Sequence, residues 1–503
     1  MLAEGRDKQQ TSYILTDIEL PSGKYEDGEL IEEGSFRVES DSMGQVKVPA
    51  ERLWGSQTQR SLQHFSIGSA RMPKAVYHAY GYVKKAAATV NRDSGRLPEE
   101  KADLITKVAD EVIEGKLDEE FPLFVWQTGS GTQSNMNVNE VISNRAVQLA
   151  GGRLGTKDPV HPNDHVNMSQ SSNDSFPTAM HIAVVLEFSE HLIPKVKDLI
   201  GAIRKKADEW VDVVKIGRTH LQDATPLTVG QEWSGYAAQL EDDLRRVEAS
   251  MNDLYKLAAG GTAVGTGINT LSSFGEKIAA QIANLTSHPF LSAPNKFAAQ
   301  GSLDAMVAAS ASLRALAVSL MKIANDLRWL GSGPRAGLHE LKLPANEPGS
   351  SIMPGKVNPT QEEAMVMVCI EVIGEDNAVA FAGSQGNFEL NAMRPIIINN
   401  VLRCARILAD SSEKLRIYSI EGIELDTDKI EKYVEESLML VTALSPVIGY
   451  DKASAIAHKA QDDGTTLREA ALASGVSAEE FEKVVVPENM VGDPEKDLGK
   501  DGG

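Results

Sequence analysis

The chain has 503 residues, of which 42% are hydrophobic and 24% charged, and its formal net charge at pH 7 is -21. This balance is typical of a folded globular protein, and the length predicts several domains instead of a single core. The acidic balance argues against nucleic acid or an anionic membrane as a partner. Salt screens exposed charge beyond about 8 Å, so local hydrogen-bond donors decide whether an anionic substrate binds.

The cysteines and the apolar segments indicate the compartment. Only two cysteines occur, Cys369 and Cys404, and neither belongs to a CxxC pair or a Cys/His cluster. We expect two buried free thiols in a reducing compartment. No uninterrupted apolar run approaches the length of a membrane span, and the acidic N-terminal residues argue against a signal or transit peptide. The sequence therefore predicts a cytoplasmic protein without a membrane partner.

The two ends of the chain differ from its middle. Residues 1–35 are polar and acid-rich, so we expect a flexible extension there. Residues 36–170 mix short helices and turns, with a small hairpin expected over 43–48, and are predicted to form an N-terminal domain that is mostly helical. Residues 428–495 are predicted to form a small C-terminal helical domain, and residues 496–503 a disordered tail.

The central region, residues 171–427, is predicted to be a bundle of long helices. Long stretches nearly free of glycine and proline carry apolar residues at helical spacing. Four such helices are expected, over 175–214 with a kink at Pro194, 230–259, 302–330 and 360–382. Helices that are apolar on more than one side need partners beyond their own chain. We therefore expect a multi-helix core that copies of the chain build together.

Two polar segments lie just before predicted helices in the first half of the chain. The first runs from Thr128 to Asn137, and its hydroxyl and amide groups suit either an anion cradle or simple helix capping. The second runs from Ser169 to Asp174, ahead of Pro177, which we expect in the first turn of the next helix. Neutral donors at a helix start can hold a carboxylate, so both interpretations stay open for both segments.

A third segment, residues 217–226, contains His220 between Thr219 and a turn that ends at Pro226. A lone histidine is more often a structural polar residue than a catalytic one. Its position among polar residues beside a turn favours a functional role for His220.

The fourth segment, residues 349–363, is the most informative. Two glycines bracket a loop that carries the Ser350 hydroxyl and ends in the Lys356 ammonium group. Asn358 and the following proline are expected to cap a helix and occupy its first turn. Glu363 either complements the dipole of that helix or partners a histidine, and the two roles are compatible.

A short motif at residues 161–165 contains two histidines, an asparagine and an aspartate. It lacks a third ligand at helical spacing, so the sequence favours no metal there. We expect an enzyme that uses neither a metal nor another cofactor.

Together these four segments resemble the fumarase/aspartase superfamily, and their details resemble the class II fumarases. The resemblance extends over about residues 36–495 and is strongest in the loop from Gly349 to Pro359. It implies a three-domain, mainly α fold whose central bundle forms a homotetramer, with each active site shared between three subunits. It also implies reversible hydration of fumarate to malate in the tricarboxylic acid cycle.

The resemblance implies roles for matched residues. Ser350 corresponds to the base that removes a proton from malate, and His220, polarised by Glu363, to the acid that acts through a water molecule. Lys356 corresponds to a catalytic and substrate-binding cation. The remaining substrate-binding positions are Ser130, Thr132, Asn135, Ser171, Ser172, Asn173, Thr219 and Asn358. Charge builds on a substrate carboxylate as the proton leaves, and such donors stabilise that charge.

One region departs from the family pattern. His161, Asn163 and Asp164 match a secondary anion site of the family, but Asp158 replaces an expected basic residue and His165 an expected acid. The secondary site is therefore in doubt in this chain. Two alternatives to fumarate hydration are an aspartate ammonia-lyase on the same scaffold and a non-catalytic, crystallin-like structural protein. The intact set of Ser350, Lys356 and His220 argues against the structural alternative.

Overall fold

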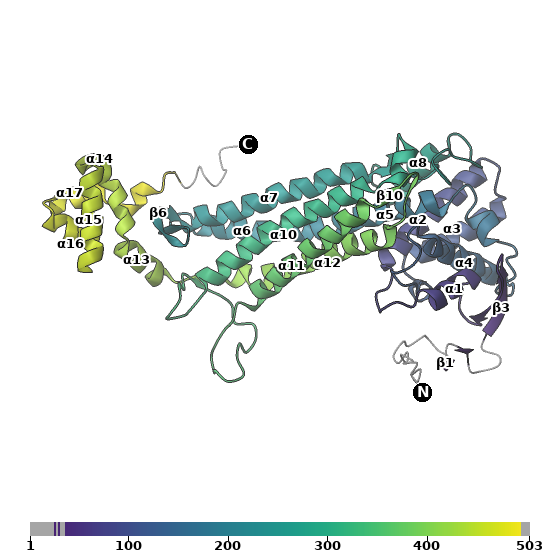
Figure 1. Ribbon diagram of the computed structural model, residues 1–503, viewed down its shortest axis with the longest axis horizontal. Coiled ribbons are helices and arrows are strands. Elements are labelled where there is room, and N and C mark those ends of the chain that lie inside the picture. The colour runs from purple at the N-terminus through teal and green to yellow at the C-terminus, as the bar shows by residue number, and fades with distance from the viewer. Residues whose placement is uncertain (1–24, 27–28, 31–35, 494–503) are drawn as a thin grey trace, which may run out of the picture.

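The computed structural model describes residues 25–26, 29–30 and 36–493. A long helical bundle joins an N-terminal part to a small C-terminal part, and the described strands pair only two by two (Figure 1). The predicted mainly α fold class is thereby confirmed. The predictions for residues 1–35 and 496–503 lie outside the described residues, apart from the strand pair β1 (Tyr25–Glu26) and β2 (Glu29–Leu30).

The N-terminal part starts with a β-hairpin and continues in four helices. The expected hairpin is present and pairs Phe36 with Pro49 at its open end. Its strands and the helices are β3 (Phe36–Asp41), β4 (Gly44–Pro49), α1 (Ser56–His64), α2 (Lys74–Asp93), α3 (Glu99–Ile113) and α4 (Thr132–Leu149). Helix α2 buries Val76, Tyr80 and Val83 at helical spacing and packs against α3 and the first bundle helix.

The bundle contains the predicted long helices. They are α5 (Ser172–Glu187), α6 (Ile193–Glu209), α7 (Val229–Leu254), α10 (Asp304–Leu330) and α11 (Thr360–Gly383). Helix α10 contains neither glycine nor proline, and it buries Leu313, Leu320 and Leu327 against α7 and α11. The kink expected at Pro194 is a π-helical turn, Phe188–Leu192, which joins α5 to α6. Pro194 lies at the start of α6 directly after this turn, so the residue that cannot donate a backbone hydrogen bond coincides with the break in the regular α-helical pattern.

One long bundle helix, α12 (Arg394–Tyr418), was not singled out from the sequence. Pro395 and two adjacent asparagines interrupt its apolar pattern, but the proline lies at the helix start, where it is tolerated. Helix α12 packs against α6 and α11 and buries Ile397, Val401 and Leu408. It therefore completes the bundle.

Helix α10 is also long and apolar enough to cross a membrane, by length and composition alone. The expectation that no segment approaches a membrane span is therefore too strong. Half of its most apolar stretch is buried within the chain, as in the core helix of a soluble protein.

Short elements connect the bundle helices. The strand pairs are β5 (Val214–Thr219) with β6 (Gln222–Thr228), β7 (Lys256–Leu257) with β8 (Leu291–Ser292), β9 (Leu341–Lys342) with β12 (Glu424–Leu425), and β10 (Gly386–Asn387) with β11 (Leu390–Asn391). Two short helices, α8 (Phe274–Thr286) and α9 (Lys296–Gly301), lie beside the N-terminal end of the bundle (Figure 1). The helix predicted over 175–214 ends at Glu209, and strand β5 begins at Val214.

The C-terminal part has a hydrophobic core of its own, built around Leu444, Ile456 and Ala471. Its helices are α13 (Thr427–Glu436), α14 (Ser445–Ile448), α15 (Tyr450–Asp463), α16 (Leu467–Ala473) and α17 (Ala478–Val484). The N-terminal part and the bundle share one continuous core. The boundaries expected near residues 170 and 427 stay predictions.

Candidate active site

Two helix N-termini meet where the N-terminal part joins the bundle. Helix α4 begins at Thr132 and α5 at Ser172, and the Thr132 and Ser172 hydroxyl oxygens lie 2.8 Å apart. The Ser130 hydroxyl lies 2.9 Å from that of Thr132, so three hydroxyls form a connected row. Ser171 and Asn173 occupy the adjoining first turn of α5. We call these five residues the cradle, since helix N-termini and hydroxyls together suit a carboxylate.

The backbone around the cradle is tightly fixed. Gly131 has φ +80°, and a Cβ there would lie 2.4 Å from the Phe176 ring. Ser171 caps α5 in a reciprocal capping box with Asp174. The helix therefore starts at Ser172, and Pro177 lies inside it and not in its first turn, contrary to the prediction.

Asn135 lies beneath the cradle in a buried polar layer. Its side chain is 2% exposed and accepts a hydrogen bond from Lys84 Nζ at 2.7 Å. Lys84 also donates to the amide oxygens of Gln170 and Asn167 at 2.9 and 3.3 Å. Burial lowers the pKa of Lys84 to about 7, with Asp174 opposing the shift. Asn135 is therefore held by this layer.

Lys84 was not among the residues singled out from the sequence. A signal was available, because Lys84 lies on the apolar face of α2, between Tyr80 and Ala87. A lysine on a buried helix face requires partners to satisfy its ammonium group. That pattern indicates a polar network even without a structure.

Thr219 and His220 lie at the tip of the β5–β6 hairpin and are exposed. His220 and Leu221 form the two-residue turn, with φ values of 56° and 60°. Such a turn usually takes Asn-Gly, and other residues are strained there. The Arg218 guanidinium and the Lys215 ammonium group both pair with Glu340, at 2.6 and 2.9 Å, which fixes the hairpin to the bundle.

The loop from Gly349 to Asn358 is exposed and is closed by hydrogen bonds of its own. The Ser350 hydroxyl oxygen accepts hydrogen bonds from the backbone N–H groups of Ile352 and Met353, at 3.3 and 3.0 Å. Asn358 donates through its side chain to the Gly349 carbonyl and does not cap α11, whose N-cap position is Pro359. The segment 345–357 surrounds a cavity of about 450 Å³, and Lys356 lines it.

Glu363 lies in the first turn of α11, where it complements the helix dipole, and its side chain is exposed. Within residues 36–493 of one chain, no ion pair joins it to His220. The neighbouring Glu362 is buried and accepts a hydrogen bond from Ser419. Burial raises the pKa of Glu362, so this carboxyl belongs to the bundle core and not to the exposed site.

The residues predicted for one site therefore lie in two groups. The cradle and Asn135 are at the N-terminal end of the bundle, and His220, Ser350 and Glu363 are at its C-terminal end (Figure 1). Helix α5 contains 16 residues, the π turn that follows it contains 5, and helix α6 contains 17. At 1.5 Å per residue these helices put about 55 Å between the two ends.

The motif at residues 161–165 overlaps a π-helical turn, Pro162–Val166, whose N-cap residue is His161. The His161 Nδ1 atom accepts hydrogen bonds from the backbone N–H groups of Asn163 and Asp164, both at 3.1 Å. His165 accepts one from the His161 N–H at 2.8 Å. Burial lowers the pKa of both histidines, so both favour the neutral form. Asp158 is exposed nearby.

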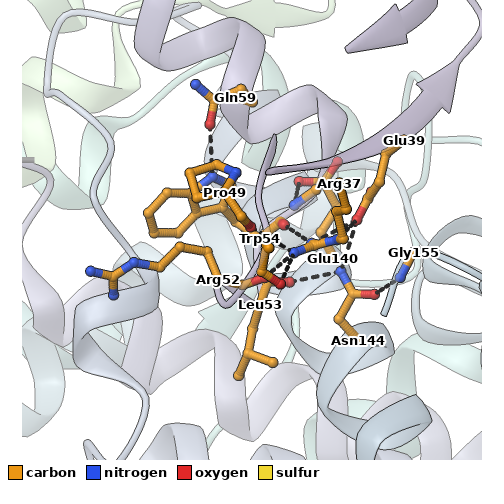
Figure 2. Close-up of polar contacts among 12 residues, drawn as sticks. Arg37, Glu39, Pro49, Arg52, Leu53, Trp54, Gln59, Glu140, Asn144 and Gly155 are labelled. Atoms are coloured by element: carbon orange, nitrogen blue, oxygen red, sulfur yellow. Dashed lines mark hydrogen bonds and ion pairs between the residues drawn. The ribbon is translucent and has the colours of Figure 1, made fainter. Parts of the chain in front are cut away.

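A cavity of about 310 Å³ opens beside this turn. Glu39, Glu140 and Asn144 line it, and Figure 2 shows how they lie close to the Arg37 guanidinium. The Glu140 carboxylate accepts three backbone hydrogen bonds and one from the Thr58 hydroxyl at the start of α1, but burial outweighs them and raises its pKa to about 7. An acidic lining does not favour an anion.

The cysteines and the possible metal ligands have ordinary surroundings. Cys369 and Cys404 are buried free thiols, as predicted. Within the described ranges, no group of three or more histidine, cysteine, aspartate or glutamate side chains is arranged to hold a metal ion.

Comparison with known proteins places the chain in a family. The model of the lyase family matches residues 44–374, and that of the fumarase C C-terminus matches residues 440–492. The chain therefore belongs to the lyase family.

Similarity to individual relatives identifies the class of lyase to which the chain belongs. The chain is 74% identical to the class II fumarate hydratase of Methanosarcina acetivorans, over 92% of this chain and 96% of that one. It is 58% identical to a mitochondrial fumarate hydratase of Rhizopus oryzae, over 91% and 93% of the two chains. A crystal structure of class II fumarase from Schistosoma mansoni superimposes with a TM-score of 0.89 at 42% identity, covering 91% and 99%. Within the lyase family, the chain belongs to the class II fumarate hydratases, which are hydro-lyases.

Proposed function

We propose that the chain interconverts fumarate and malate at a site that several copies of it build together in a homotetramer. The observation that carries this proposal is the division of the predicted site residues between the two ends of one bundle. Groups that lie about 55 Å apart cannot act on one small dicarboxylate within a single chain. Copies that pack with their bundles antiparallel bring the two ends together, and three subunits contribute to each site.

Exposed apolar residues on the bundle support this assembly. Val318 and Trp329 on α10 are each 55% exposed, and Ile370 and Phe381 on α11 are 59% and 76% exposed. Side chains of this size on one pair of adjacent helices indicate an interface between proteins. Covering them with the same helices of other copies completes the multi-helix core.

In the proposed chemistry, the cradle of one subunit holds a substrate carboxylate through its hydroxyls and two helix N-termini. Ser350 of another subunit removes a proton from the methylene carbon of malate. The two N–H groups that point at the Ser350 oxygen stabilise the alkoxide that this role requires. Lys356 and Asn358 from the same loop stabilise the charge that develops on the neighbouring carboxylate.

The acid of the reaction is His220, which delivers a proton to the leaving hydroxyl through a water molecule. Glu363 of another copy orients and polarises the imidazole ring. The strained turn at His220 is consistent with this role, because strain collects at sites where geometry matters. The residues in these roles supply an acid, a base and donors for the developing charge without a cofactor.

As a class II fumarate hydratase, the chain acts on fumarate and malate. The proposed compartment is the cytoplasm. Purified protein, treated with a chelator, is mixed with malate and separately with aspartate while absorbance near the fumarate band is followed. We expect absorbance to rise with malate only and at an unchanged rate after chelation. A rise with aspartate alone, or loss of the malate signal on chelation that added metal restores, would overturn the proposal.

A further inference from the structure

Arg394 joins the two hydroxyl-bearing segments of the cradle from below. It is the first residue of α12 and is 0% exposed. Its Nη1 atom donates to the carbonyl oxygens of Ser130 and Ser172, both at 3.4 Å, and Nη2 donates to the Gln300 carbonyl at 3.1 Å. Its backbone N–H donates to the Gly129 carbonyl at 3.1 Å. The start of α12 therefore contacts both segments that form the row of hydroxyls.

The position of Arg394 is unfavourable for a positive charge. A guanidinium at a helix N-terminus opposes the helix dipole. In the part of the chain that the structure describes, no carboxylate lies within ion-pair distance of Arg394, and its Nε atom has no hydrogen-bond partner. A buried charge without a counterion is costly. Burial lowers the pKa of Arg394 only to about 10, so it stays charged at neutral pH.

The surrounding layer does not balance this charge. Lys84 is a second buried cation, and its hydrogen bonds go to amide oxygens. Asp174 is a buried carboxylate whose charge acts to raise the pKa of both cations. Its oxygens already accept backbone hydrogen bonds, including those from Gly260 and Thr262. At neutral pH Arg394 is charged and Lys84, with a pKa of about 7, is partly charged, so together they outweigh the one carboxylate and leave net positive charge beneath the cradle.

We propose that Arg394 is a positioning residue for the substrate, which sets the spacing of the cradle hydroxyls and places beneath them a positive charge that a dicarboxylate neutralises. The inference rests on the proposed function. It explains how a chain with a net charge of -21 attracts a doubly negative substrate, because a buried charge is screened far less than the charges on the surface. It also explains why an unpaired cation is retained at an unfavourable position.

The test compares two variants. Arg394→Met removes both the charge and the hydrogen bonds, whereas Arg394→Lys keeps the charge but cannot bridge the Ser130 and Ser172 carbonyls. The measured quantities are KM for malate, the inhibition constant of succinate, kcat and the thermal midpoint. In Arg394→Met we expect KM and the succinate constant to rise together by roughly tenfold or more, as loss of a charge-assisted contact predicts. In Arg394→Lys we expect a smaller rise, with kcat close to that of the wild type.

Arg37→Met is the matched control. The Arg37 guanidinium also donates to backbone carbonyls, those of Pro49, Arg52 and Trp54 among them, but it pairs with Glu39 and lies outside the cradle (Figure 2). This variant should lower the thermal midpoint and leave KM and the succinate constant unchanged. If Arg394→Met does the same, Arg394 is only structural and the inference is wrong.

Two further results keep the test decisive. If Arg394→Met does not fold, Arg394→Lys decides, and unchanged KM and succinate constants in that variant overturn the inference. Wild-type turnover of malate and its loss in Ser350→Ala test the proposed function separately. An active wild type with normal substrate binding in both Arg394 variants would therefore remove the inference and leave the proposed function intact.

Discussion

The two ends of the bundle hold their functional residues in opposite ways. At the N-terminal end, the Thr132 and Ser172 hydroxyls are in contact, and Lys84 and Arg394 hold the layer beneath them. At the C-terminal end, His220 is exposed at the tip of a hairpin, and the loop that carries Ser350 makes hydrogen bonds mainly within itself. In the proposed assembly, the N-terminal half of the site is formed within one chain, and the C-terminal half obtains its surroundings from other copies. Substrate binding and chemistry are therefore expected to respond differently to mutation.

The largest effect, on turnover of malate, is expected at the C-terminal end of the bundle, where Ser350 is exposed. Ser350→Ala removes the proposed base, so turnover of malate should fall by about 10²- to 10⁴-fold. The side chain is exposed, so stability should change by less than about 0.5 kcal/mol. Fumarate formation and thermal unfolding measure the two quantities. Ser351→Ala, in the same exposed loop, is the control and should keep normal turnover, and near-normal turnover in Ser350→Ala would remove Ser350 from the proposed mechanism.

Mixing a variant with an inactive loop and a variant with weakened substrate binding, assayed at malate concentrations well below KM, tests whether the two ends come from different subunits. One carries Ser350→Ala, and the other carries Thr132→Val together with Asn173→Ala. After they are dissociated and reassembled in equal amounts, about a quarter of the sites should combine an intact cradle with an intact loop, if the two come from different chains of a symmetric assembly. Recovery of roughly that fraction of wild-type turnover is the expected result.

The control mixture pairs Ser350→Ala with Lys356→Met. Both changes lie in the same loop, so every site contains one defective loop and activity should not return. If the first mixture also stays inactive although the chains assemble together, the two ends do not form a shared site.

The sequence predicted most of the helices and the exposed functional segments. Helix α10 was predictable because it lacks glycine and proline and repeats leucine at helical spacing. The loop around Ser350 was predictable because two glycines, a serine, a lysine and an asparagine follow one another within residues 349–358. The hairpin at His220 was not predicted, since its turn lacks the usual Asn-Gly. Arg394 was missed because its importance arises from burial, and local sequence contains no direct record of burial.

A smaller effect, on KM for malate, is expected at the N-terminal end of the bundle, where the cradle lies. Thr132→Val keeps the shape of the side chain but removes the hydroxyl that lies between those of Ser130 and Ser172. KM for malate should rise by about tenfold, equivalent to about 1.4 kcal/mol for a lost hydrogen bond, with a smaller change in kcat. Ser94→Ala at the C-terminal end of α2 removes a hydroxyl-to-carbonyl hydrogen bond outside the row of hydroxyls and serves as the control. Equal KM values in both variants would show that the row of hydroxyls does not bind substrate.

The smallest effect concerns the pH dependence of stability in the layer beneath the cradle. The pKa of Lys84 is lowered from 10.5 to about 7 in the folded chain, mainly by burial, with Asp174 facing it and the Tyr80 ring close by. Between these two values the unfolded chain binds more protons than the folded one, so stability rises with pH. Below about pH 7 the folded chain must keep a buried charge, and that contribution is lost.

Lys84→Met removes this titration. As the pH rises from 7 to 10, the thermal midpoint of the wild type should rise relative to that of the variant by about a few degrees. The neighbouring Lys85 is half-buried and pairs with Asp110 at 2.6 Å, so Lys85→Met is the control and should show no such gain. A difference between wild type and Lys84→Met that stays constant over this range would mean that Lys84 does not titrate there. The layer beneath the cradle would then be held in place by packing, and its buried charges would not contribute to the pH dependence of stability.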